Sequence, residues 1–208
     1  MTSDAEPLLF LPGASGNRDF WRPVSERLRH AGERRLLGYP GFGGLPVDAQ
    51  VTSLEDLASL VARDMTGPVS LIAQSMGGVV AALVALRKPE LVRRIVLTVT
   101  SGGLDLSGLG AADWRAEFAA KNPRLPRWFS VDRTDLSARL PALSAPALLL
   151  WGDADPISPV AVGRRLAQLL PKSKLIVLAG GTHDLAHERA EEVFALIDEH
   201  LSSPTPPK

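Results

Sequence analysis

The sequence predicts an α/β fold: a doubly wound, mostly parallel sheet covered by helices. Short apolar runs of strand length alternate with helical stretches along almost the whole chain, as in sheets whose strands are joined by crossover helices. The strand-like runs are apolar throughout, which is expected of parallel strands buried on both faces. Glycine and proline clusters follow several of these runs and give those strands a clear end.

Six runs have the length and composition of strands. The first ends at Pro12 and Gly13, and the second ends at the glycine-rich turn cluster 38–44. The expected strands are residues 7–11, 34–37, 69–73, 94–99, 147–151 and 175–178.

Five stretches show helical patterns. Residues 53–65 begin with Ser53 as a cap and then place leucine and valine at helical spacing, which predicts an amphipathic helix. Residues 76–88 are almost wholly apolar up to Pro89, and such a helix is expected to be buried. The expected helices are residues 19–30, 53–65, 76–88, 160–170 and 190–201.

Residues 104–140 interrupt the alternation. Gly, Pro, Arg and Trp are scattered here without a strand-like run, so we expect a small cap inserted between two strands of the sheet. The chain then divides into a first core part (1–103), the cap insertion (104–140), a second core part (141–201) and a disordered tail (202–208).

The composition excludes several classes of function. The 208 residues are enough for one domain. The 23 basic side chains balance 23 acidic ones, so no charge pattern favours nucleic acid or an anionic membrane surface as a partner. The absence of cysteine excludes disulfides, thiolate metal sites and a cysteine nucleophile. No run resembles a signal peptide or a membrane span, so we expect a cytoplasmic protein, either a monomer or a homodimer.

Residues 71–78 carry the strongest chemical signal. Ser75 stands between an apolar strand-like run and an apolar helix-like run, and Gly77 follows two positions later. This pattern is typical of a nucleophile elbow, where a strand turns into a helix so sharply that the serine adopts strained backbone geometry. Small residues must flank such a turn, and Ala73 and Gly77 meet this need. An ordinary turn serine in a glycine-rich loop is the alternative interpretation.

An acid and a histidine follow two later strands. Asp153 and Asp155 come after the fifth expected strand, and His183 comes after the sixth. Sites in open parallel sheets form at the carboxyl ends of the strands. A histidine activates a serine hydroxyl by taking its proton, and a buried carboxylate orients that histidine. Asp153 and Asp155 compete for the role of acid, and His187 competes with His183.

These segments together resemble the α/β-hydrolase superfamily over nearly the whole chain. The resemblance rests on four motifs that occur in the family's order: the loop 39–43, the elbow 71–78, the acid loop 148–156 and the histidine loop and helix 183–193. It implies a triad of Ser75, His183 and Asp155, since the family places the acid three residues after the glycine of its loop.

The resemblance also implies an oxyanion hole formed by the backbone N–H groups of Ala14 and Met76. Pro12 stands where many family members have histidine, but the hole uses main-chain donors and does not need that side chain. No metal or cofactor is implied. His183 and His187 have the i, i+4 spacing of some metal ligands, yet no glutamate-rich zincin pattern accompanies them.

The implied reaction is hydrolysis of a small carboxylic ester through an acyl-enzyme. The small cap predicts an open pocket, and four aromatic residues of the insertion are candidates either for an acyl pocket or for the core of the cap: Trp114, Phe118, Trp128 and Phe129.

Alternatives remain open at this stage. The same triad performs thioester or lactone hydrolysis, acyl transfer, and C–C bond hydrolysis of a diketo acid. The last reaction would need a cap arginine to hold the acid, and the candidates are Arg115, Arg124, Arg127 and Arg133. A signalling or receptor protein of the same fold with slow turnover is a further alternative.

Overall fold

The computed structural model describes residues 5–204 and shows a six-stranded sheet with the strand order β2-β1-β3-β4-β5-β6. The strands are β1 (Leu8–Leu11), β2 (Arg34–Leu36), β3 (Val69–Gln74), β4 (Val92–Thr98), β5 (Ala147–Gly152) and β6 (Ser173–Leu178). All neighbouring strands in the described part of the chain pair in parallel. The predicted parallel α/β sheet is therefore confirmed, and each strand lies within two residues of its expected position.

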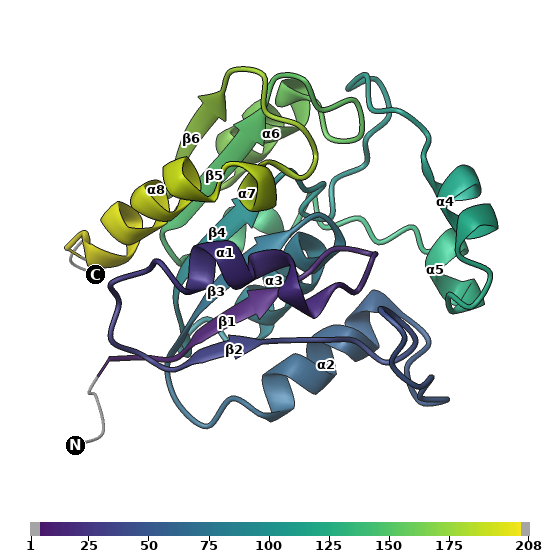
Figure 1. Cartoon of the computed structure of the whole chain (residues 1–208), viewed down its shortest axis with the longest axis horizontal. Coiled ribbons are helices and arrows are strands. Elements are labelled where there is room, and N and C mark those ends of the chain that lie inside the picture. The colour runs from purple at the N-terminus through teal and green to yellow at the C-terminus, as the bar shows by residue number, and fades with distance from the viewer. Residues whose placement is uncertain (1–4, 205–208) are drawn as a thin grey trace.

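Helices cover both faces of the sheet. One face packs on α2 (Leu54–Arg63), α3 (Met76–Arg87) and α6 (Val160–Leu169), and the other packs on α1 (Arg22–Ser25), α7 (Leu185–Glu188) and α8 (Ala190–Ser202). Figure 1 shows α1, α7 and α8 gathered together on one face.

Strand geometry divides the core between these two layers. Leu9 and Leu11 of β1 belong to the cluster with α2 and α3, whereas Leu8 and Phe10 belong to the cluster with α1 and α8. Successive side chains of a strand point to opposite faces, so a strand that is apolar at every position stabilises both layers. Helix α3 is buried on nearly every side, as its composition predicts.

The expected helix 19–30 is broken in the structure. It is replaced by a 3-10 turn, η1 (Arg18–Trp21), and the short helix α1, which ends at Ser25. Pro23 lies at the start of α1, because proline has no amide N–H to continue a preceding helix and is accommodated best in a first turn.

The insertion carries two short helices, α4 (Arg115–Lys121) and α5 (Arg127–Val131). Figure 1 shows this pair standing apart from the sheet, on the side toward which the strand arrows point. At the boundary between the second core part and the expected tail, α8 extends to Ser202, the first residue of that tail. Residues 205–208 of that tail lie outside the described residues. Within residues 5–204, no helix is long and apolar enough to cross a membrane.

Candidate active site

Ser75 occupies a sharp turn between β3 and α3. Its backbone has φ 52° and ψ −123°, a region that non-glycine residues rarely adopt. A Cβ atom at Gly77 would lie 2.5 Å from the carbonyl oxygens of Leu11 and Pro12, so only glycine fits beside the turn. The Ser75 N–H donates to the carbonyl of Thr98 at 3.0 Å. The strained turn is thus held between β1 and β4.

Three loops at the carboxyl ends of the strands bring Ser75, His183 and Asp155 together. His183 Nε2 lies 3.0 Å from Ser75 Oγ, and His183 Nδ1 lies 2.7 Å from Asp155 Oδ2. Asp155 is buried, and its Oδ1 accepts a hydrogen bond from the Ile157 N–H at 2.8 Å. The arrangement allows His183 to take a proton from the serine while the buried carboxylate orients the ring.

The two candidate acids have different surroundings. Asp153 is exposed, and its Oδ1 accepts a hydrogen bond from the Gly180 N–H at 2.5 Å. It therefore links the loops after β5 and β6, whereas Asp155 contacts His183.

His187 is engaged elsewhere. Its Nδ1 lies 2.9 Å from the carbonyl of Phe20, and its ring packs against the Phe20 ring with centroids 5.8 Å apart. His183 faces Ser75 and Asp155 instead, so the two histidines make separate sets of contacts.

The turn after β1 lies directly against Ser75. A Cβ atom at Gly13 would stand 3.1 Å from the Ser75 Cβ, and the next residue is Ala14. Ala14 and Met76 are both buried. Within the described part of the chain, the backbone N–H groups of these two residues donate to no acceptor. Buried free donors beside a nucleophile are what an oxyanion hole requires.

Gln74 is a site residue that the sequence reasoning missed. Its side chain is buried, and its Nε2 donates to the backbone carbonyl of His183 at 3.2 Å. Its Oε1 lies 2.3 Å from where a Gly13 Cβ would be. One amide side chain therefore contacts both the loop of the histidine and the turn after β1. Its position directly before the elbow serine was the signal available in the sequence.

A cavity of about 660 Å³ opens beside Ser75 and His183. Trp114 and Phe129 of the insertion line it, but Phe118 and Trp128 do not. Of the four aromatic residues that were candidates either for an acyl pocket or for the core of the cap, two thus line the cavity and two do not. Phe118 packs behind Trp114 with ring centroids 5.3 Å apart. Trp128 packs on Phe42 of the core, with ring centroids 5.9 Å apart, and so lies between the cap and the core.

The cap arginines also divide into two groups. Arg115 and Arg133 line the same cavity. Arg124 and Arg127 are exposed and do not line it.

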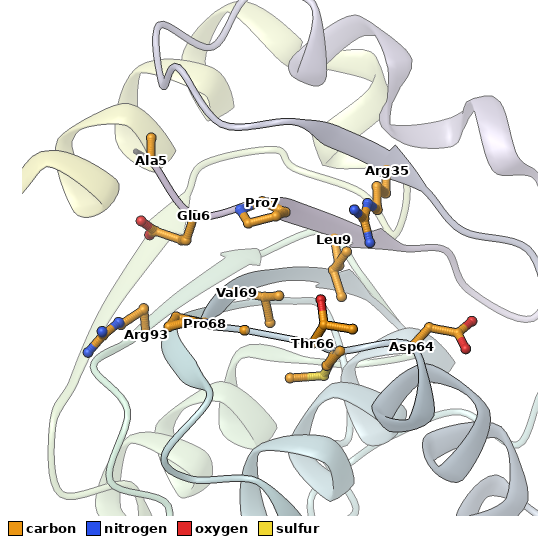
Figure 2. Close-up of a pocket in the computed structure, with 12 residues that line it drawn as sticks. Ala5, Glu6, Pro7, Leu9, Arg35, Asp64, Thr66, Pro68, Val69 and Arg93 are labelled. Atoms are coloured by element: carbon orange, nitrogen blue, oxygen red, sulfur yellow. The ribbon is translucent and has the colours of Figure 1, made fainter. Parts of the chain in front are cut away.

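A second, smaller cavity of about 380 Å³ lies at the opposite end of the sheet. Figure 2 shows Leu9 and Val69 at its centre, with Glu6, Arg35 and Arg93 around it. It lies at the amino ends of β1 and β3 and contains none of the triad residues.

The chain matches known proteins over most of its length. A model described as the alpha/beta hydrolase family matches residues 8–139, and one described as TAP-like protein matches residues 126–208. The pimeloyl-[acyl-carrier protein] methyl ester esterase of Neisseria meningitidis serogroup C is 25% identical, covering 94% of this chain and 93% of that protein. Polyketide synthase ThaQ of Burkholderia thailandensis is 26% identical over 93% of this chain, which spans only 12% of that longer protein.

Solved structures share the fold. An esterase from Thermogutta terrifontis superposes with a TM-score of 0.78 at 24% identity, covering 96% of this chain and 90% of that one. A hydrolase from Oleispira antarctica superposes with a TM-score of 0.82 at 17% identity, covering 98% of this chain and 93% of that one.

Proposed function

We propose that this chain, which belongs to the alpha/beta hydrolase family, acts on esters as its relative is named to do and cleaves small carboxylic esters through an acyl group on Ser75. The observation that carries this proposal is the continuous hydrogen-bond chain from the Ser75 hydroxyl through His183 to the buried Asp155. A structural serine in a turn would not need a histidine and a buried acid aligned behind it.

In the first half-reaction, Ser75 Oγ attacks the carbonyl carbon of the ester while His183 Nε2 takes the hydroxyl proton. Asp155 stabilises the imidazolium that forms. The negative charge that develops on the carbonyl oxygen is received by the N–H groups of Ala14 and Met76. The C–O bond to the alcohol then breaks, and His183 gives its proton to the departing alkoxide.

In the second half-reaction, water replaces the alcohol. His183 takes a proton from the water as its oxygen attacks the acyl carbon, and the same N–H groups receive the oxyanion. The bond to Ser75 Oγ breaks, the proton returns to that oxygen, and the carboxylic acid leaves. Every step uses side chains and backbone N–H groups of this chain, together with water.

The first test is the initial rate on p-nitrophenyl esters from acetate to dodecanoate, with Ser75→Ala as the control. We expect turnover of short esters that disappears in the variant. No turnover by a folded wild-type protein would overturn the small-ester proposal and favour a specialised substrate or a receptor role.

The relatives favour a second candidate substrate. One of them is named as an esterase for an acyl-carrier-protein methyl ester, and another is a polyketide synthase. An acyl group held on a carrier as an ester or thioester is therefore the alternative. Faster turnover of acyl-pantetheine thioesters than of p-nitrophenyl esters with the same acyl group would select it.

A further inference from the structure

Arg115 is placed differently from the exposed arginines of the cap. It is the first residue of α4, is half-buried, and lines the cavity that also holds Ser75 and His183. Its Nη1 donates to the backbone carbonyl of Asp132 at 2.7 Å, which fixes the side chain. A guanidinium has five N–H donors, so most of its hydrogen-bonding capacity remains for a ligand.

No carboxylate among residues 5–204 lies within ion-pair distance of Arg115, taken as 4.0 Å. Burial lowers the pKa of the guanidinium, and the nearby positive charge of Arg133 lowers it further, together by more than the negative charges of Asp132 and Asp113 raise it. Both effects mean that the protein holds this cation in surroundings that disfavour it. An anion bound in the cavity would offset both.

The carboxylates around the same cavity are occupied or exposed. They are Asp105, Asp113, Asp132 and Asp135. Three of them accept a hydrogen bond from the main-chain N–H two residues later in their own loops, and only Asp132 is not exposed. They line the cavity, and the negative charges of Asp132 and Asp113 only partly offset the unfavourable surroundings of Arg115.

We infer that Arg115 binds an anionic group of the substrate, and that the preferred substrates are esters carrying a carboxylate away from the scissile bond, such as half-esters of dicarboxylic acids. This inference rests on the proposed function, since it names the substrate class of the same site. Arginine binds carboxylates through two parallel N–H donors. The nucleophile and Arg115 share one cavity of about 660 Å³, and Trp114 and Phe129 offer apolar wall for the methylene chain.

The test compares mono-p-nitrophenyl glutarate with p-nitrophenyl pentanoate, which has the same number of acyl carbons and no charge. We expect Arg115→Gln to lower kcat/KM for the half-ester by about 10- to 100-fold, the effect of losing a charged hydrogen bond. The neutral ester should change less than about twofold. Arg124→Gln, on the exposed surface of the same cap, is the matched control and should change neither rate. An equal loss on both esters in Arg115→Gln, or no loss on either, would overturn the assignment.

A measurement on the wild-type protein tests the inference without depending on whether the variant folds. Free glutarate should inhibit hydrolysis of the neutral ester competitively, and added salt should weaken this inhibition. Turnover of the neutral ester with no preference for the half-ester and no inhibition by glutarate would overturn the anion assignment alone. Absence of turnover on both esters would overturn the proposed function, and the present inference with it.

Discussion

The two ends of the sheet each carry a cavity, and the two cavities differ in what their polar groups are doing. At the carboxyl ends, Ser75, His183 and Asp155 form one hydrogen-bond chain. At the amino ends, several of the charged groups already have partners within the fold. Glu6 accepts a hydrogen bond from Ser70, and Arg35 pairs with Glu33; Figure 2 shows Glu6 and Arg35 at the cavity. An enclosed volume is therefore not enough to identify a site; polar groups must converge with hydrogen-bonding capacity to spare.

Parallel topology explains this difference. Loops that leave the carboxyl ends lead into helix N-termini, so free N–H groups and the positive end of the helix dipole face that side. Helix α3 begins directly after Ser75. The amino ends receive chain from helix C-termini, which present carbonyl groups instead. Chemistry that develops negative charge is favoured at the carboxyl ends.

The largest predicted effect contrasts two serines at opposite ends of β3. Ser75→Ala should lower kcat about 10⁴-fold or more, because it removes the nucleophile. Ser70→Ala removes the fully buried hydroxyl that donates to Glu6 at 2.9 Å. It should cost about 1 kcal/mol of stability and leave kcat/KM within about twofold. Ester hydrolysis and denaturant unfolding of both variants make the comparison, and substantial turnover by Ser75→Ala would contradict the elbow assignment.

The second prediction separates the two acids of one loop. Asp155→Asn should lower kcat by about 10³- to 10⁴-fold, because the amide no longer stabilises the imidazolium and favours the wrong tautomer. Asp153→Asn changes only a link to Gly180 and should cost less than about tenfold. Steady-state rates of the two isosteric variants measure this ratio. The reverse order would move the acid to Asp153.

The sheet was predictable because each strand is a local apolar run. Parallel strands are buried on both faces, so each run is apolar at every position. The elbow was predictable for a similar reason, since a turn this tight demands small residues close in sequence. The choice of Asp155 over Asp153 needed the family resemblance. In the structure it depends on which carboxylate faces His183, 28 residues away.

The cap was less predictable. Trp114 and Phe129 line the cavity, while Phe118 and Trp128 pack behind it. Which face of a short helix borders a cavity depends on tertiary contacts, and the sequence pattern does not show these. For the same reason, the role of Gln74 was not predicted. Its hydrogen-bond partner, the His183 carbonyl, lies 109 residues later in the chain.

The third prediction tests Gln74 as a positioning residue. Gln74→Ala should lower kcat about tenfold with little change in KM, because the His183 loop loses its tie to the elbow. Gln74→Glu gives a sharper readout. Its negative charge near His183 should favour the protonated ring and move the acidic limb of the kcat/KM profile to higher pH. An unchanged pH profile would leave Gln74 with a packing role alone.

The prediction with the smallest expected effect on activity concerns His200, at the amino end of the sheet. Burial lowers the pKa of its ring to about 4, and the positive charge of Arg94 contributes to this. The unfolded chain binds a proton near pH 6.5, so the stability linked to His200 is complete above that pH and is lost as the pH falls toward about 4. The loss should be on the order of 2 kcal/mol in unfolding free energy.

Urea unfolding of the wild-type protein and of His200→Gln between pH 4 and pH 7 isolates this contribution, since the difference between the two curves removes the other titrating groups. The wild-type protein should lose more stability than the variant as the pH falls. Parallel curves would show that the pKa of the His200 ring is the same in the folded and the unfolded protein. Because His200 lies at the end of the sheet remote from Ser75, kcat should be the same for both proteins wherever both are folded. A change in kcat would show instead that the two ends of the sheet are coupled.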